Sequence, residues 1–338
     1  MGQRTQLQAR GGDALPSARR RTKPRTSPTL PAMAEEVRAS LLATPRSIPS
    51  KYFYDDRGSQ LFEAITRLPE YYLTRTEESL LEAHADALIA RLRPREIVEL
   101  GSGAGRKIRL LLEAQRRAGG LGRLVLFDIN PGVLEASAAR LASDFPGLAI
   151  ERVVGDFTSD LERLGPGGSR LMLFLASTIG NIHPDEVPDF LARAADQLAI
   201  GDHFLIGVDQ VKDVARLEAA YDDSLGVTAE FNRNVLRALN AALGGDFDPA
   251  GFDHVAFYDS GNAWIEMRLR ARRSQRVRLP GAGIELRLAR GEEIRTEISA
   301  KYTRASFMAR MAGSGLSLEA WITDAERQFA LALLRRDA

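Results

Sequence analysis

The chain has 338 residues, of which 44% are hydrophobic, and it carries a formal net charge of +1. No apolar run approaches the roughly 18 residues of a membrane-spanning helix, and the near-zero charge gives no electrostatic case for nucleic acid as the main partner. Cysteine is absent and the four histidines do not stand at metal-ligand spacing, which excludes disulfides, a thiolate metal site and a cysteine nucleophile and argues against zinc.

The first 32 residues differ in composition from the rest of the chain. They hold seven Arg or Lys, one Asp and four Pro, with no apolar periodicity. Such a segment cannot bury enough apolar surface to offset its chain entropy, so we predict a disordered basic tail over residues 1–32. The alternatives are an arm that binds RNA or a targeting signal, although the segment has no apolar region of the secretory type. The run that starts at Met33 resembles a natural beginning of the protein.

Helical and strand patterns alternate from residue 76 onward. The segment 76–92 has helical apolar spacing, and we predict Thr76 as its N-cap. Pro131 suits the first turn of a later helix, where its missing N–H has no intrahelical partner. The other predicted elements are strands at 96–100, 121–129, 148–156, 169–177 and 202–210 and helices at 106–118, 131–145 and 184–198. This alternation predicts an α/β fold with a parallel, doubly wound sheet.

The first strand of this sheet runs into a turn with very little side chain. Gly101, Gly103 and Gly105 form the pattern G-x-G-x-G and open the next helix. Small residues let backbone N–H groups approach a ligand closely at the carboxyl ends of the strands. The spacing differs from the G-x-G-x-x-G of a dinucleotide fingerprint. A basic residue, Lys107, follows within the first helical turn, either as a ligand contact or as an ordinary surface charge.

Acidic residues follow at the ends of the second and third strands. Asp128 is placed to accept hydrogen bonds from two ribose hydroxyls. Asp156 precedes Phe157, a pair that suits an adenine, because the carboxylate accepts from the exocyclic amine and the ring packs on the base. The ordered set E-L-G-S-G-A-G, F-D-I and G-D-F is typical of enzymes that bind S-adenosylmethionine. We therefore predict this cofactor and no metal; the alternative is that both aspartates are only helix or turn caps.

Polar residues also stand where the apolar fourth strand ends. Ser177, Thr178 and Asn181 follow one another there, and the end of this strand faces the methyl donor in this architecture. Asn181 offers both a donor and an acceptor. We predict that Thr178 and Asn181 lie on the substrate side of the site, although on their own they would be interpreted as turn residues.

Long stretches of the chain resemble a known family. The segment 47–77, the stretch F-L-A-S-T-I-G-N and the segment 220–240 are similar to signatures of the L-histidine Nα-methyltransferases of ergothioneine biosynthesis, as are F-D-H-V-A-F-Y-D, W-I-E-M-R-L-R-A and R-T-E-I-S-A-K-Y. The resemblance runs from about residue 36 to the C-terminus. It implies a Rossmann-like class I methyltransferase core with a second, substrate-binding domain. It also implies that S-adenosylmethionine methylates the α-amine of histidine three times, which gives hercynine.

The resemblance also implies site residues. It places the cofactor on Gly101, Lys107, Asp128, Asp156 and Phe157. It places the substrate's α-amine and carboxylate on Tyr71, Asn181 and Tyr221, and the imidazole on Glu297 and Ser299. The rest of the substrate pocket consists of Tyr54, Phe62, Thr178 and Met267.

Catalysis in such a site needs no covalent intermediate. Tyr54 and Tyr71 are the candidate catalytic residues, because a desolvated pocket, or a water near Tyr54, would supply the neutral amine without a dedicated general base. One departure from the family is visible, since Ala176 stands where glycine is expected. An added methyl near the substrate amine is expected to influence the later methylations and not the class of reaction.

The domain organisation follows from the same resemblance. We expect the substrate-binding domain to consist of residues 36–75 and 211–300, and the methyltransferase core of residues 76–210 with a C-terminal return at 301–338. In the return we expect a helix ended by glycine and a final edge strand. We also expect a cytoplasmic monomer that binds a small molecule and neither nucleic acid nor a membrane.

Three rival functions stay open from the sequence. A nicotinamide-dependent dehydrogenase usually has G-x-G-x-x-G, which is missing here. An RNA-binding protein could use the basic tail, but the folded part has no basic stripe. A relative that methylates another aromatic amino acid, such as a tryptophan derivative, is expected to lose the contact to Glu297.

Overall fold

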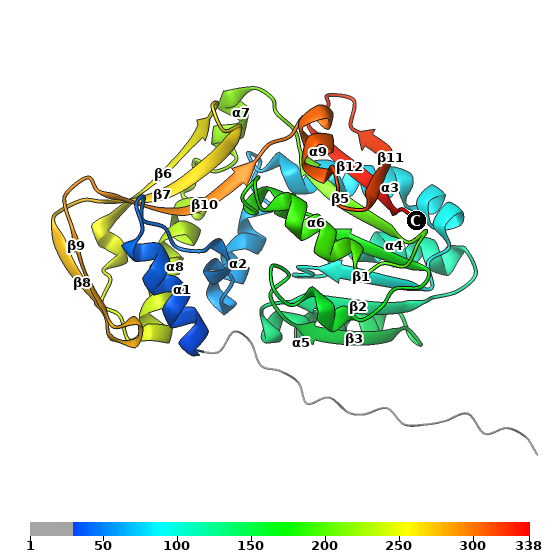
Figure 1. Cartoon of the computed structure of the whole chain (residues 1–338), viewed down its shortest axis with the longest axis horizontal. Helices are drawn as coiled ribbons and strands as arrows, with labels where there is room; N and C mark the ends of the chain where they lie inside the picture. Colours follow the sequence, from blue (N-terminus) through cyan, green and yellow to red (C-terminus); the bar gives the residue numbers. More distant parts are fainter. Residues whose placement is uncertain (1–29) are drawn as a thin grey trace, which may run out of the picture.

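The computed structural model describes residues 30–338, and a seven-stranded sheet forms its larger part (Figure 1). The strand order is β11-β12-β5-β4-β1-β2-β3. Strands β1 to β5 pair with one another in parallel, whereas β12 pairs antiparallel with both β5 and β11. The strands of this sheet are β1 (Glu96–Leu100), β2 (Arg123–Asp128), β3 (Ala149–Val154), β4 (Arg170–Phe174), β5 (His203–Asp209), β11 (Leu316–Thr323) and β12 (Phe329–Arg336). The predicted α/β class with a parallel, doubly wound sheet is confirmed.

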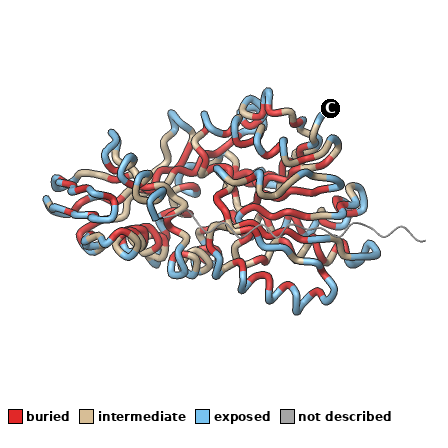
Figure 2. The backbone as a smooth tube through the Cα atoms, turned by 60° about the horizontal axis from the view of Figure 1, so that its bottom comes forward, coloured by how far each residue is buried: buried red, intermediate tan, exposed pale blue. Residues whose placement is uncertain are grey.

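Helices cover both faces of this sheet. One face packs on α3 (Tyr72–Leu92), α4 (Arg106–Arg117) and α5 (Pro131–Asp144), and the other packs on α6 (Val187–Ala195) and α9 (Arg304–Met311). The alternation of side chains along β1 explains this arrangement, since Ile97 belongs to the first apolar cluster and Val98 to the second. The buried parts of the tube run through the strands, and the turns at the rim are exposed (Figure 2).

A second group of elements stands beside the carboxyl ends of the parallel strands (Figure 1). It contains a three-stranded antiparallel sheet, order β10-β7-β6, and the pair β8-β9. The strands are β6 (Phe252–Asp259), β7 (Trp264–Ala271), β8 (Gln275–Leu279), β9 (Ile284–Leu288) and β10 (Glu293–Ala300), and the helices are α1 (Leu30–Leu42), α2 (Asp56–Ile65), α7 (Val214–Ala219) and α8 (Val227–Leu243). Segments far apart in the sequence meet here, because Phe53 stacks on Phe231 with ring centroids 4.6 Å apart.

The N-terminal expectations need two corrections. The predicted tail over 1–32 lies outside the described residues except for its last three, which form the first turn of α1, so the helix begins before Met33. The predicted N-cap at Thr76 is wrong, because α3 already begins at Tyr72. Tyr72 and Leu73 are buried, and this burial sets the start of the helix, while the Thr76 hydroxyl donates to the Tyr72 carbonyl one turn back.

The predicted final edge strand is also wrong. β12 lies between β5 and β11, and β11 is the edge strand. The run from Phe329 to Leu334 is buried on both faces, as expected for an interior strand. The C-terminal return is therefore one helix and two strands, and α9 ends at Met311, two residues before Gly313. In the part of the chain that the structure describes, no helix is both long and apolar enough to span a bilayer.

Candidate active site

A cavity of about 1300 Å³ lies between the carboxyl ends of the parallel strands and the second group of elements. Its lining residues come from segments far apart in the sequence, between Glu36 and Ser299. Every site residue expected from the sequence is among them: Tyr54, Phe62, Tyr71, Gly101, Lys107, Asp128, Asp156, Phe157, Thr178, Asn181, Tyr221, Met267, Glu297 and Ser299. The fold thus brings the predicted set together, and the individual roles stay predictions.

The turn after β1 forms one end of this cavity. Gly101 and Gly103 adopt φ of +69° and +48°, a left-handed conformation that favours glycine. The N–H of Gly103 donates to Asp128 at 3.0 Å, and the N–H of Asn130 donates to the other carboxylate oxygen at 3.0 Å. Burial raises the pKa of Asp128, although these backbone donors oppose the rise. Asp128 therefore ties the turn to the end of β2, and its carboxylate faces the cavity.

A buried carboxylate without a partner stands beside this turn. Glu99, at the end of β1, lines the cavity, and its Oε2 has no hydrogen-bond partner. Burial raises the pKa of Glu99 to about 8, although Lys107 lowers it. An orphaned acceptor of this kind fits a ligand that brings a cation, such as the ammonium group of S-adenosylmethionine.

We expect Glu99→Gln to stabilise the free protein at pH 8. The pKa of Glu99 is about 8 in the folded chain and about 4.3 in an unfolded one. The ionised form is therefore disfavoured in the folded state. The contribution of Glu99 to the free energy of unfolding falls as pH rises from about 4.3 to 8. Thermal melting should show a higher melting temperature for the variant at pH 8, with a difference that shrinks toward pH 5. A difference that is constant with pH would contradict the assignment.

Asp156, the predicted adenine ligand, forms an ion pair. Asp156 accepts from Lys51 at 3.0 Å and from the N–H and hydroxyl of Thr158 at 2.8 and 2.6 Å. Burial opposes the charge, but Lys51 and the two donors of Thr158 together outweigh it and hold the pKa of Asp156 below its usual range. Phe157 packs edge-on against Phe174 with ring centroids 5.0 Å apart. Lys51, in the short helix η1 (Ser50–Phe53), thus links the second group of elements to the cofactor end, and the sequence did not identify it.

Lys107 and the loop after β4 share one buried partner. Glu77 forms an ion pair with Lys107 and accepts from the N–H of Ala176 at 3.0 and 2.8 Å. Gly207 leaves room for this carboxylate, since a Cβ there would lie 1.9 Å from Glu77 Oε1. Glu77 therefore fixes both a predicted cofactor residue and the entry to the loop. Sequence reasoning missed this role, because Glu77 stands in a helix like an ordinary surface charge.

The loop after β4 has an unusual backbone. Ala176 and Ser177 adopt φ of +61° and +56°, which is the left-handed region. The family's glycine fits this conformation without strain, whereas alanine costs about 1 kcal/mol. We expect Ala176→Gly to leave the free energy of unfolding unchanged or raise it by up to about 1 kcal/mol. Denaturant titration checks this, and a clear loss of stability would contradict the interpretation of the backbone.

The opposite end of the cavity holds a second buried carboxylate. Burial raises the pKa of Glu297 to about 7, against the effects of Asn181 and Lys301. The Asn181 amide donates to Glu297 and, at 2.9 Å, to the carbonyl of Ile298. Asn181 ends the short helix η3 (Thr178–Asn181). Both of its amide hydrogens are used, so its carbonyl oxygen is the atom that is left for a ligand.

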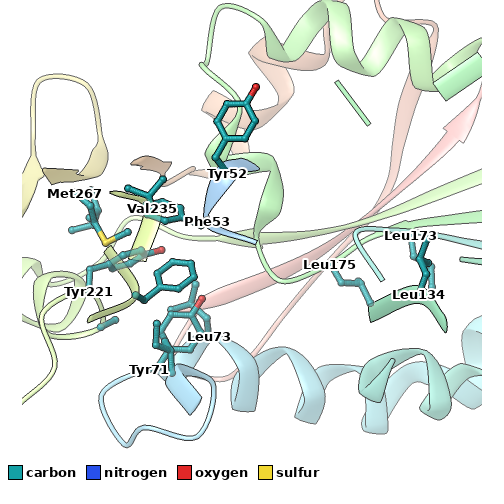
Figure 3. Packing of buried hydrophobic residues seen from close by; sticks show 14 of the residues in the cluster. Tyr52, Phe53, Tyr71, Leu73, Leu134, Leu173, Leu175, Tyr221, Val235 and Met267 are labelled. Atoms are coloured by element: carbon teal, nitrogen blue, oxygen red, sulfur yellow. The ribbon is translucent and has the colours of Figure 1, made fainter. Parts of the chain in front are cut away.

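Two hydroxyls stand next to Glu297. Tyr221 and Ser299 are hydrogen-bonded at 2.7 Å. The Tyr221 ring lies edge-on to Tyr71 with centroids 6.3 Å apart. Met267 is drawn just above Tyr221 in the close-up (Figure 3). Burial raises the pKa of Tyr71 well above its ordinary value. These phenols are therefore neutral hydrogen-bonding groups.

Aromatic rings enclose this end of the cavity. Phe62 lies edge-on to Tyr54 at 5.8 Å and to Tyr71 at 6.2 Å. Phe231 of α8, which sequence reasoning missed, packs within 6.0 Å of Phe62. Burial also raises the pKa of Tyr54, so a phenolate base is not available in this pocket. The wall is apolar with a few polar groups, as ligand sites generally are.

The arrangement has room for a nucleoside that carries an amino acid at one end and for a small polar ring at the other. Among residues 30–338 no group of three or more His, Cys, Asp or Glu is placed to hold a metal ion.

Comparisons with known proteins point in one direction. A family model described as histidine-specific methyltransferase, S-adenosylmethionine-dependent, matches residues 33–336. The chain is 46% identical over 305 residues to a histidine N-alpha-methyltransferase of Mycolicibacterium smegmatis. The aligned region covers 90% of this chain and 95% of that protein. It is 45% identical over 302 residues to a histidine N-alpha-methyltransferase of Mycobacterium tuberculosis, with 89% and 94% covered. It is 36% identical over 233 residues to ergothioneine biosynthesis protein 1 of Neurospora crassa, with 63% and 26% covered.

Proposed function

Because the chain belongs to the family of histidine-specific, S-adenosylmethionine-dependent methyltransferases, we propose that it trimethylates the α-amine of L-histidine. The product is hercynine, and the reaction is the first step of ergothioneine biosynthesis. Relatives that are 45–46% identical over about 90% of the chain carry the histidine N-alpha-methyltransferase name and support this substrate. The single observation in the molecule that carries the proposal is the buried Glu297, held by Asn181 at the end of the cavity.

Glu297 and Ser299 are proposed to bind the imidazole. A carboxylate accepts from a ring N–H, and a hydroxyl serves the other ring nitrogen. An apolar aromatic side chain would leave the buried carboxylate unpaired, which is costly. This is why the alternative substrate, another aromatic amino acid such as a tryptophan derivative, is not favoured.

Tyr71, Asn181 and Tyr221 are proposed to hold the α-amine and carboxylate of the substrate. Neutral phenols and an amide bind these groups without competing as nucleophiles. Met267 packs beside the ring, and Tyr54, Phe62 and Thr178 complete the wall. We propose that residues 36–75 and 211–300 act as the substrate-binding domain, since most of these side chains come from them.

The cofactor is proposed to lie along the turn of glycines. Asp128 holds the ribose, Asp156 and Phe157 hold the adenine, and Gly101 and Lys107 border the methionine end. S-adenosylmethionine supplies a methyl group that is already activated by its sulfonium. The residues of the chain align the amine, exclude water, and admit the amine in its neutral form, which desolvation favours. The alternative to desolvation is a water near Tyr54 that passes the proton of the substrate's ammonium group to solvent.

Calorimetric titration separates the classes of function. S-adenosylmethionine should bind, whereas NAD and RNA should not. Binding of NAD in place of S-adenosylmethionine would contradict the proposal. A monomeric state and a cytoplasmic location stay predictions.

A further inference from the structure

A buried cation lies directly behind two side chains of the substrate end. Lys301 follows β10, and its side chain has no exposed surface. Its Nζ is 2.9 Å from the Tyr221 hydroxyl, 2.8 Å from the Ser299 hydroxyl and 2.8 Å from Asp209 Oδ2. An ammonium group has three donor hydrogens and no acceptor. Lys301 is therefore fully satisfied, and it donates to both hydroxyls.

Asp209 keeps this cation charged. It is fully buried at the end of β5. It accepts from the Tyr72 hydroxyl at 2.9 Å and forms a second ion pair with Lys212. Burial opposes the charge of Asp209, but the two lysines outweigh it and the pKa of Asp209 lies below its usual value. Burial likewise opposes the charge of Lys301, yet Asp209 raises the pKa of Lys301 above its usual value.

The hydrogens on the two hydroxyls can be counted. Tyr221 and Ser299 together carry two hydroxyl hydrogens, and one of them lies in the bond between their oxygens, 2.7 Å apart. Because Lys301 can only donate, neither hydroxyl can direct its hydrogen toward Lys301. One hydrogen therefore remains for a bound ligand. The pair donates once to the substrate and no more.

We propose that Lys301 is a positioning residue that makes Ser299 a hydrogen-bond donor toward the unprotonated nitrogen of the substrate's imidazole. In the proposed arrangement Tyr221 donates to Ser299, which also accepts from Lys301, and the hydrogen of Ser299 then points to the ring. Glu297 accepts from the N–H on the other ring nitrogen. The site thus recognises one N–H and one lone pair, which is the pattern of a neutral imidazole. This inference rests on the proposed function.

The pattern separates imidazole from pyrrole. A pyrrole ring has an N–H for Glu297 but no lone pair for Ser299, so the buried Ser299 hydroxyl would lose its acceptor. The test compares histidine with the two pyrrolylalanines, in each of which one ring nitrogen is replaced by C–H. Wild type should prefer histidine over the better analogue by at least about tenfold in kcat/KM.

Lys301→Met should reduce this preference to near parity. Without the cation, the free hydrogen of the pair is no longer kept away from the Lys301 side, where Asp209 has lost a donor, and it no longer needs an acceptor on the ring. The affinity for S-adenosylmethionine, measured by titration, should stay as in wild type. Lys212→Met is the matched control, because Lys212 binds the same carboxylate but contacts neither hydroxyl; it should keep the preference for histidine.

Two results would overturn the proposal. One is a Lys301→Met enzyme that keeps the full preference, and the other is a Lys212→Met enzyme that loses it equally. If thermal melting shows that Lys301→Met does not fold, Ser299→Ala and Tyr221→Phe decide. Ser299→Ala should lose the preference and Tyr221→Phe should keep it, because Lys301 still donates to Ser299; the reverse pattern overturns the proposal.

Failure of the proposed function looks different. A wild type that methylates no histidine overturns the proposed function and this inference together. A wild type that methylates histidine but does not discriminate against the pyrroles overturns this inference alone.

Discussion

Glu297→Ala is expected to raise the KM for histidine by about 10- to 150-fold, which corresponds to the loss of a charged hydrogen bond of roughly 1.5–3 kcal/mol. The carboxylate is buried and faces the cavity, where it is the predicted acceptor for the ring N–H. The affinity for S-adenosylmethionine should change little, because Glu297 lies at the other end of the cavity. Steady-state kinetics together with cofactor titration measure both quantities.

The same variant should relax selection against apolar rings. The buried charge that penalises tryptophan and phenylalanine is removed, and space is left in its place. Glu293→Ala is the matched control, since Glu293 lies on the same strand but pairs with Arg268 and Arg270 at the surface. If both variants behaved alike, or if Glu297→Ala left the KM for histidine unchanged, Glu297 would not be the imidazole ligand.

Asp128→Ala is expected to weaken S-adenosylmethionine by at least about tenfold, roughly 1.4 kcal/mol. Two effects act together, because the variant loses the acceptor for the ribose hydroxyls and also the two backbone hydrogen bonds that hold Gly103 and Asn130. Asp128→Asn retains one acceptor oxygen and separates the two effects. Calorimetric titration measures the affinity.

The control for Asp128→Ala is a surface carboxylate in the same region. Asp144, at the end of α5, is partly exposed and forms an ion pair with Arg109. Asp144→Ala should bind the cofactor as wild type does. Unchanged cofactor affinity in Asp128→Ala would remove Asp128 from the site.

The cofactor end of the site could be predicted from the sequence because its residues follow local patterns. The glycine turn and Asp128 each stand directly after a buried strand, and the carboxyl ends of parallel strands meet at one edge of the sheet. The apolar runs of those strands are long enough to be recognised one at a time. Right-handed connections between parallel strands limit the arrangements of the sheet, but the strand order itself comes from the structure.

The side chains that position the site could not be predicted in this way. Glu77, Lys51 and Lys301 are charged residues in ordinary amphipathic patterns, and only the fold shows that their partners come from distant elements. Because Tyr72 is buried, α3 begins at Tyr72, before the N-cap that was expected at Thr76. Thr178 and Asn181 were predicted from their place after the fourth strand, but the other substrate residues were found only through the resemblance to the family, since a tyrosine or a glutamate in a strand carries no local sign of its ligand.

The most direct test of the proposed function is mass spectrometry of histidine incubated with the protein and S-adenosylmethionine. Mono-, di- and trimethylated histidine should appear in sequence, with every methyl on the α-nitrogen and none on the ring, and the trimethylated product should accumulate. Ring-methylated histidine, or a wild type that methylates tryptophan in preference to histidine, would contradict the assignment of Glu297 and Ser299 to the imidazole.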